Sequence, residues 1–133
     1  MDESVLAIGS GDDVVRVRQQ VRVAAADNGL SLVDQTKLVT AASELARNTL
    51  IHGGGGRATV EVVKSPNGRT GIKLSFTDEG PGIPNLELAL TDGWSSGTGL
   101  GLGLSGARRL VDEFELDSKP GIGTSIVVVK WSR

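Results

Sequence analysis

The chain has 133 residues, a formal net charge of −2 and 38% hydrophobic residues, which suits one globular domain over residues 1–133. The near-neutral charge provides no basic field for nucleic acid, and the lack of cysteine excludes disulfides, thiolate metal sites and thiol nucleophiles. The acidic N-terminus does not have the pattern of a signal peptide, and no apolar run approaches the ~18 residues of a membrane span. A cytoplasmic domain with no membrane or nucleic-acid partner is therefore expected.

The first part of the chain predicts a strand followed by two helices. Residues 5–8 form the expected strand. The first helix is expected to be capped by Asp12 and Asp13 and to stop at residues 28–29, although its many valines also permit a strand. The second helix is expected to begin after Ser31 and to stop at the glycine run 53–56. The residues expected on its buried face are Leu38, Ala42, Leu45, Ala46 and Thr49.

The second part of the chain predicts strands on either side of a helical region. The expected strands are residues 57–64, 70–77, 115–118 and 122–131. Between the second and third of these, the sequence predicts a loop, a short helix, a polar glycine-rich loop and a longer helix, at residues 78–84, 86–90, 92–101 and 102–114. This order predicts an α+β fold in which helices cover one face of a sheet.

Three polar residues recur at four-residue spacing on the second predicted helix. Glu44, Asn48 and His52 project from the same side of that helix, along one edge of its buried face, where they can line a cleft between helix and sheet. A carboxylate can orient or deprotonate a hydroxyl, and an amide oxygen can bind Mg²⁺. Taken alone, such residues are more often part of a solvated surface, so their function depends on the rest of the chain.

An aspartate and two glycines follow directly from a predicted strand. An ionised carboxylate only accepts hydrogen bonds, so Asp78 would favour adenine, whose exocyclic amine donates, over guanine, which presents an oxygen there. Gly80 and Gly82 would let the backbone pass close to a base. Thr124, which follows Gly123 before the last strand, could support the same contact. An ordinary turn and an ordinary hairpin are the alternatives for these two segments.

Glycines alternate with other residues through positions 97–103, directly before the third long helix. Glycine-rich backbone leading into a helix N-terminus offers N–H groups and a dipole that favour phosphate. A Rossmann motif is excluded because no strand precedes the segment, and a Walker A motif because Gly-Lys-Ser/Thr is missing. A flexible loop is the alternative.

In their order and spacing, these segments resemble the nucleotide-binding boxes of the GHKL ATPases, the superfamily of gyrase, Hsp90, sensor histidine kinases and anti-sigma-factor kinases. The resemblance covers essentially the whole chain. It places an N box at 44–52, an adenine-binding G1 box at 78–82, a lid with the G2 box at 92–104, and a threonine near adenine at Thr124. It implies the two-layer α/β sandwich of the Bergerat fold, with a mixed sheet, and ATP and Mg²⁺ as cofactors.

Within the superfamily, the chain looks most like the RsbT-type switch kinases of the stressosome. Residues 44–48, 78–84, 109–114 and 130–131 carry this similarity. It implies a protein-serine/threonine kinase that phosphorylates STAS-domain antagonist proteins in a bacterial stress response. By partner switching, such a kinase also tends to activate a PP2C-type phosphatase once its antagonists release it.

The resemblance also implies a role for each site residue. Glu44 would act as the catalytic base on the acceptor hydroxyl, and Asn48 would ligate Mg²⁺. Adenine would lie on Asp78 near the residues Gly80, Gly82 and Thr124. The phosphates would lie under the backbone of Gly99, Gly101 and Gly103, a register preferred for its distance from the helix around residue 108. His52 would help to bind phosphate, although a structural role at the helix end fits it equally well.

Three other functions stay open. The first is an anti-sigma-factor kinase that binds a sigma factor directly, and the second is a nucleotide-dependent binding switch with little turnover. The third is an excised catalytic fragment of a histidine kinase. A complete histidine kinase needs a phosphoacceptor histidine on a separate dimerisation helix, and the single histidine of this chain, His52, lies within the N box.

Overall fold

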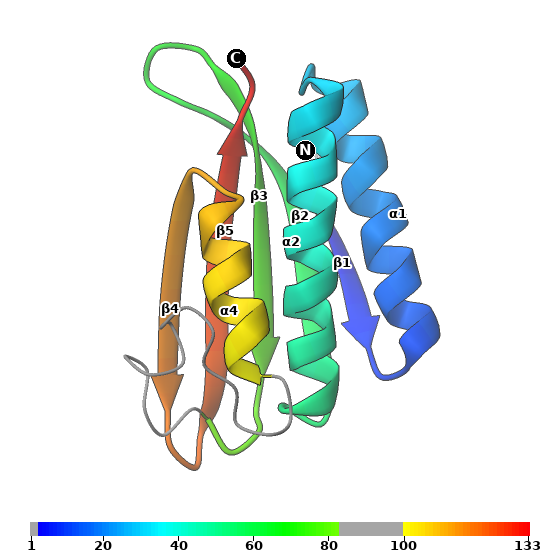
Figure 1. Cartoon of the computed structure of the whole chain (residues 1–133), viewed down its shortest axis with the longest axis vertical. Coiled ribbons are helices and arrows are strands. Elements are labelled where there is room, and N and C mark those ends of the chain that lie inside the picture. Colours follow the sequence, from blue (N-terminus) through cyan, green and yellow to red (C-terminus); the bar gives the residue numbers. More distant parts are fainter. Residues whose placement is uncertain (1–2, 83–99) are drawn as a thin grey trace.

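The computed structural model describes residues 3–82 and 100–133 and has the predicted two-layer α+β architecture. Its elements are β1 (Glu3–Ile8), α1 (Gly11–Asp27), α2 (Leu32–Ile51), β2 (Gly56–Lys64), β3 (Thr70–Asp78), α4 (Leu100–Arg109), β4 (Glu113–Lys119) and β5 (Gly123–Trp131). The strands form one sheet, and the described helices lie together on one of its faces (Figure 1). The short helix expected at 86–90 lies outside the described residues, as do residues 92–99 of the loop expected at 92–101.

The strand order in the sheet is β1-β2-β3-β5-β4, and every pairing in the described part of the chain is antiparallel. The expectation of a mixed sheet is therefore wrong. Two antiparallel helices, α1 and α2, connect β1 to β2. They return the chain to the end of the sheet where β1 finished, so β2 runs antiparallel to β1. The strands β3 and β4 do share a direction, but β5 lies between them and is antiparallel to both.

Serine side chains cap the N-termini of the first two helices, α1 and α2. Ser31 caps α2 as predicted, because its Oγ accepts a hydrogen bond from the backbone N–H of Asp34 at 3.1 Å. The cap of α1 is Ser10, whose Oγ accepts from the N–H of Asp13 at 3.3 Å, so the expectation of an aspartate cap is wrong. Asp12 and Asp13 instead lie in the first turn, where their negative charge favours the helix dipole.

The third long helix is shorter than predicted. It begins at Leu100 and ends at Arg109, whereas the apolar spacing of the sequence predicted a helix over 102–114. Phe114 belongs to β4, in which exposed and half-buried residues alternate along the strand. The backbone N–H of Asp112 already donates to the carbonyl of Val129 at 2.9 Å, so pairing with β5 begins before a further helical turn can form.

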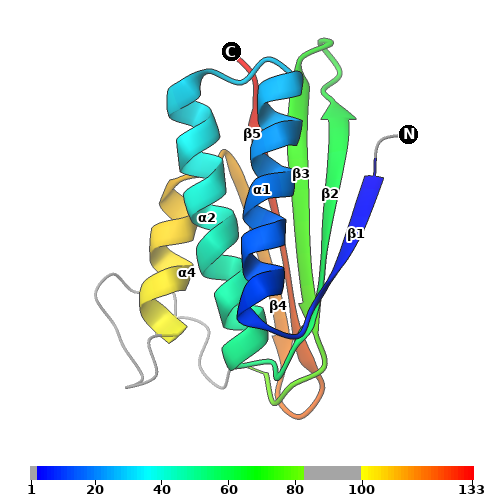
Figure 2. The ribbon, with the colours of Figure 1, turned by 90° about the vertical axis from the view of Figure 1, so that its right-hand side faces the viewer.

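The hydrophobic core lies between the sheet and the helices (Figure 2). Alternate strand residues point into it, and on β3 these are the buried side chains Ile72, Leu74 and Phe76. The predicted buried face of α2 is confirmed, since Leu38, Ala42, Leu45, Ala46 and Thr49 are all buried. None of the helices within residues 3–82 and 100–133 combines the length and apolar character needed to cross a membrane.

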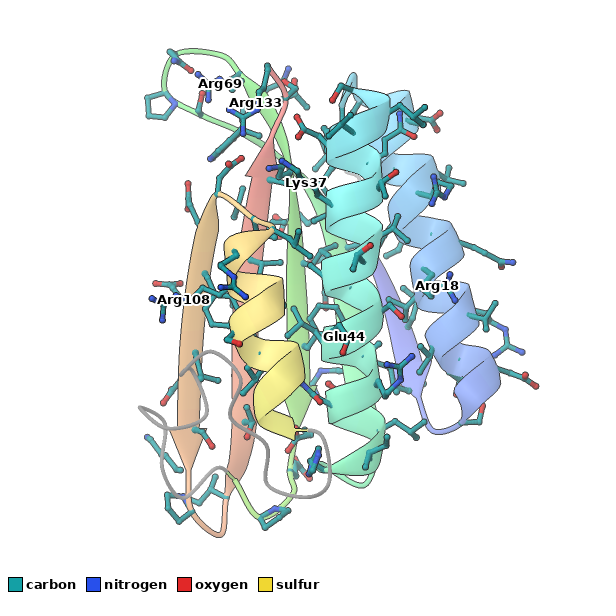
Figure 3. All side chains as sticks on the ribbon, viewed as in Figure 1. Arg18, Lys37, Glu44, Arg69, Arg108 and Arg133 are labelled. Carbon is teal, nitrogen blue, oxygen red and sulfur yellow. The ribbon has the colours of Figure 1, made fainter. Side chains whose placement is uncertain are left out.

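The two ends of this sandwich differ in chemistry. At one end α2 and β3 finish, and β5 and α4 begin (Figures 1 and 2). At the other end lies a cluster of charged residues that we call the ion cluster: Asp34, Asp112, Lys130 and Arg133. The Nζ atom of Lys130 lies 3.6 Å from a carboxylate oxygen of each aspartate. Arg133 reaches the same two carboxylates at 3.3 and 3.1 Å, and Figure 3 shows it at this end of the molecule.

Candidate functional site

A pocket lies where α2, α4, β3 and β5 meet. Its lining residues are Asn48, Thr49, His52, Phe76, Asp78, Gly82, Leu104, Thr124 and Ile126. The apolar members are buried, whereas the polar members come from the last turns of α2 and from the facing ends of the two strands. The structure therefore brings together residues that are up to 78 positions apart in the sequence (Ile126 minus Asn48). An apolar pocket with a few convergent polar groups is the usual form of a small-molecule site.

Asp78 is placed in this pocket by the sheet. It is the last residue of β3, and its partners across the ladder are Gly56 on β2 and Thr124 on β5. Directly opposite residues share a face of the sheet, so Asp78 and Thr124 both face the helices. The backbone N–H of Gly80 donates to Oδ1 of Asp78 at 2.9 Å, which orients the carboxylate while leaving it an acceptor toward the pocket.

Glycine backbone surrounds Asp78 closely. A Cβ added to Gly53 would lie 2.4 Å from the Cβ of Asp78, and one added to Gly123 would lie 2.2 Å from its carbonyl oxygen. A Cβ on Gly80 would lie 2.7 Å from the Cα of Gly53, so the end of α2 and the loop after β3 meet backbone to backbone. No ordinary side chain fits at these points. The sequence predicted a site role for Gly80 but treated Gly53 only as a helix stop and Gly123 as part of a hairpin.

Gly82 fixes the other side of the same loop. Its φ of +79° is a conformation that glycine adopts readily, and a Cβ there would lie 2.5 Å from the carbonyl oxygen of Lys119. The neighbouring carbonyl of Pro81 accepts a hydrogen bond from the N–H of Gly121 at 2.8 Å. The loop after β3 is therefore bound to the β4–β5 turn as well as to α2.

Asn48 brings an unsatisfied polar group to the pocket. Its Nδ2 atom is buried and has no hydrogen-bond partner among the residues that the structure describes. Its backbone carbonyl accepts from the N–H groups of His52 at 2.9 Å and Gly53 at 3.3 Å, which ends α2. A buried polar atom without a hydrogen-bond partner destabilises the folded state, and a bound ligand can provide the missing partner.

The residues present fit a magnesium ion that is bound together with phosphate. Within the described residues, no group of three or more His, Cys, Asp or Glu side chains is placed to hold a metal ion by itself. Mg²⁺ characteristically uses few protein ligands and takes the remainder from phosphate and water. Turning the Asn48 amide would put its oxygen where the unpartnered Nδ2 atom now lies, so a single amide ligand is available there.

Glu44 lies outside the pocket lining, one helical turn before Asn48. Its Oε1 lies 3.3 Å from a guanidinium nitrogen of Arg47, and 38% of its side chain is exposed. Figure 3 shows Glu44 on the flank of α2 that is turned toward α4. The structure therefore separates Glu44 from the other residues predicted on its helix edge. Glu44 therefore lies one helical turn from the pocket, with part of its side chain open to solvent.

The predicted phosphate-binding glycines are only partly within the described residues. Gly99 lies outside them, whereas Gly101 and Gly103 belong to the first turn of α4. The sequence placed Gly101 at the end of a loop and began the helix at residue 102, whereas the structure begins the helix two residues earlier, at Leu100. Leu104, one residue after Gly103, is buried and lines the pocket, so the N-terminal part of α4 adjoins the site.

The fold and the pocket define a class of protein, the helix-and-sheet sandwiches with a pocket at the end of α2. Residues 33–132 match the family of histidine kinase-, DNA gyrase B- and HSP90-like ATPases. The chain belongs to this family.

Two relatives that match along nearly their whole length narrow the class. The chain is 43% identical to the serine/threonine-protein kinase RsbT of Bacillus subtilis, over 99% of this chain and 98% of that protein. It is 28% identical to an anti-sigma F factor of Bacillus licheniformis, over 98% of this chain and 90% of that protein. Among solved structures, the RsbU and RsbW domains of a Mycobacterium tuberculosis protein share the fold with a TM-score of 0.68 and 21% identity, covering 100% of this chain and 33% of theirs.

These matches decide several of the expectations from the sequence. They confirm the GHKL resemblance, the similarity to RsbT-type kinases, the sandwich fold and the enzyme class, an ATP-dependent protein-serine/threonine kinase. The roles of Glu44, Asn48, His52, Asp78, Thr124 and the glycines stay predictions.

Proposed function

We propose that this chain, as one kinase domain over residues 1–133, transfers the γ-phosphate of ATP to a serine or threonine of STAS-domain antagonist proteins in the cytoplasm. The observation that carries the proposal is the pocket that joins Asn48, Asp78 and Thr124 in a chain 43% identical to a serine/threonine-protein kinase. Both RsbT and the anti-sigma F factor match along nearly the whole chain, which supports a protein that works by exchanging protein partners.

In this proposal the base of ATP is recognised at the strand ends. Asp78 accepts a hydrogen bond from the exocyclic amine of adenine, and the glycine contacts around it allow the ring to approach the backbone. Gly82 and Thr124 line the same pocket and complete the purine site. Phe76, Leu104 and Ile126 provide its apolar floor, which excludes water from one side of the base.

The phosphates lie between the end of α2 and the start of α4. Asn48 would hold Mg²⁺, which supplies charge neutralisation when bound. The backbone N–H groups near Gly101 and Gly103 point out of the first turn of α4 and favour an anion, and His52 adds a polar group from the end of α2. Phosphoryl transfer depends mainly on such positioning and neutralisation.

Glu44 is the residue that meets the second protein. Its partly exposed carboxylate, held near Arg47, would accept the proton of the acceptor hydroxyl as that oxygen attacks the γ-phosphorus. After phosphorylation the antagonist leaves, and the kinase is available to activate a PP2C-type phosphatase. An anti-sigma-factor kinase is the second candidate, and the 28% match to an anti-sigma F factor favours it.

The test is phosphate transfer from labelled ATP with Mg²⁺ to purified STAS-domain proteins of the same organism. Asp78→Asn should abolish both ADP binding and transfer, because the carboxylate acceptor is lost. Glu44→Ala should keep ADP binding and lower transfer by about 100-fold or more, the usual effect of removing a general base. Glu115→Gln, a change at an exposed residue of β4, is the matched control and should leave both unchanged.

Two results would change the proposal. Full transfer by Glu44→Ala would remove that residue from the chemistry. A lack of transfer to every STAS-domain protein, together with tight binding to a sigma factor, would select the anti-sigma-factor kinase instead.

A further inference from the structure

Three polar side chains lie in one row across the end of the sheet. Asp78 on β3 is the ladder partner of Thr124 on β5, and Thr124 is the ladder partner of Ser118 on β4. All three therefore face the helix layer. Asp78 and Thr124 line the pocket, whereas Ser118 lies behind Thr124 on an edge strand and is not part of the lining.

The hydroxyls of Ser118 and Thr124 are hydrogen-bonded to one another, with 3.0 Å between the two oxygens. Each hydroxyl carries one hydrogen and can accept two. The Oγ of Ser118 also donates to the carbonyl oxygen of Gly123 at 3.3 Å, which uses the single hydrogen of the serine. The serine then has no hydrogen left for its 3.0 Å contact with Thr124, so the hydroxyl of Thr124 donates the hydrogen in that contact.

This arrangement sets the polarity of Thr124 toward a ligand. When its hydrogen points at Ser118, the Oγ1 of Thr124 presents only lone pairs to the pocket, beside the carboxylate of Asp78. Two adjacent acceptors suit a ligand group that donates twice, such as the exocyclic amine of adenine. A purine with a carbonyl oxygen at the same ring position would meet acceptors alone.

We infer that Ser118 is a specificity-determining residue, which holds Thr124 as an acceptor and so selects purines with an amine at position 6. This inference rests on the adenine site proposed above. Ser118 does not touch the ligand and acts through Thr124, so it is a positioning residue.

The predicted consequence of removing the Ser118 hydroxyl is a change in selectivity. Without it, the hydrogen of Thr124 is released and can turn toward the pocket, where it can donate to a carbonyl oxygen. ADP and IDP are the probes, because they have the same phosphates and ribose and differ at position 6 of the base. Contacts to the phosphates therefore cancel in the ratio of their dissociation constants.

The experiment measures Kd for ADP and IDP by calorimetry on the wild type and on a matched pair of variants. Ser118→Val and Ser118→Thr have the same shape, suit a strand, and differ in the hydroxyl. The wild type should prefer ADP, and Ser118→Val should lower the IDP-to-ADP ratio of Kd values by about tenfold, the effect of one hydrogen bond gained or lost at a buried acceptor. Ser118→Thr should retain the wild-type ratio.

The control is Ser125→Ala, which removes a hydroxyl next to Thr124 in the chain but on the opposite face of the sheet. It should leave the ratio unchanged, and Ser118→Ala repeats the test in case valine disturbs the edge strand. An unchanged ratio in Ser118→Val and Ser118→Ala, with ADP still bound, would overturn the role of Ser118 and leave the proposed function in place. A wild type that binds neither nucleotide, or both equally, would instead overturn the adenine site itself.

Discussion

Asp78 is positioned mainly by backbone contacts. The loop after β3 presses on Gly53 at the end of α2, and the first residue of β5, Gly123, lies against the carbonyl of Asp78. Backbone atoms have few alternative positions, so the carboxylate is held more rigidly than side-chain packing alone would hold it. This rigidity suits a residue that must present one acceptor in a fixed direction.

A methyl group at Gly53 should therefore damage the site before it damages the fold. In Gly53→Ala the new Cβ would lie 2.4 Å from the Cβ and Cγ of Asp78, and the two segments must separate. Overpacking of this kind costs about 1–3 kcal/mol, so ADP affinity measured by calorimetry should fall by about 10- to 100-fold.

Gly11→Ala is the control for Gly53→Ala, because a Cβ at Gly11 meets nothing within 4 Å. That variant should bind ADP as the wild type does. Equal ADP affinity for Gly53→Ala and the wild type would show that the loop after β3 can move away from α2 without loss of the site.

At the residue scale, the sequence predicted the polar residues that line the pocket better than the residues that hold them in place. Asn48 and His52 follow from helical spacing, and Asp78 follows from its place at the end of a strand. The roles of Gly53 and Ser118 depend on contacts with Gly80 and Thr124, which pairing and loop packing create. No local pattern encodes such contacts, although the run of four glycines at 53–56 was a signal of close backbone approach.

The first turn of α1 shows how a few polar groups determine where a helix begins. Asp13 accepts a hydrogen bond from the backbone N–H of Gly9 at 2.8 Å and forms an ion pair with Arg16. Ser10 caps the same turn. The hydrogen bond from Gly9 is the main reason that the pKa of Asp13 lies below its ordinary value of 3.8, and the charge of Arg16 lowers this pKa further. The lowered pKa means that folding favours the ionised form.

Asp13→Asn should therefore lose stability in a pH-dependent way. A carboxyl whose pKa is lowered in the folded state contributes stability above its ordinary pKa of 3.8, and the contribution disappears as the pH falls through the lowered value. Thermal unfolding should show the wild type above Asp13→Asn at pH 7, with a gap that narrows below pH 3.8. Asp12→Asn, in the same turn, is the control, and an equal pH-dependent gap for both variants would contradict the assignment.

The sequence predicted an element correctly where its pattern fitted one kind of structure, and the prediction was wrong where the pattern fitted both a helix and a strand. The cap and buried face of α2 agree with the sequence, because the serine cap and the apolar spacing mark the same helix. The apolar residues at 110, 111 and 114 fit a longer α4, and the last of them also fits the start of β4. Pairing with β5 selects the strand, and pairing depends on a segment that follows in the chain.

At the scale of the whole molecule, the pocket lies where α2 and β3 end and β5 begins, and the ion cluster lies at the opposite end of the sheet (Figure 1). The ion cluster joins the first turn of α2 to the start of β4 and the end of β5. Lys130 is buried, with 4% of its side chain exposed, and its ammonium group is paired with the carboxylates of Asp34 and Asp112. The cluster therefore fixes how α2 lies on the sheet without contacting the pocket that α2 helps to form.

Lys130→Met should destabilise the fold and spare the site. It leaves the buried carboxylate of Asp34 with Arg133 as its cationic partner, and breaking a buried ion pair costs about 3–5 kcal/mol. Urea unfolding should show that loss, while the Kd for ADP stays within about twofold because the pocket lies at the other end. Lys37→Met, at an exposed position of α2, should change the free energy of unfolding by less than about 0.5 kcal/mol. A stable Lys130→Met protein would show that the cluster adds no net stability.

The overall architecture was predictable in its layers but not in its strand directions. The order of helices and strands was sufficient to predict helices on one face of a sheet. The directions depend on which strands become neighbours, and the insertion of β5 between β3 and β4 joins segments that are not consecutive in the chain.

The position of β5 between β3 and β4 also limits how far the chain can fold during its synthesis. In the described sheet β4 pairs with β5 alone, and β5 follows every other strand in the chain, so the sheet cannot be completed during translation until residues 123–131 have left the ribosome. Before then, β3 has an open edge, and the pocket lacks Thr124 and Ile126. The nascent chain should therefore be unable to form the complete pocket until β5 has paired with β3.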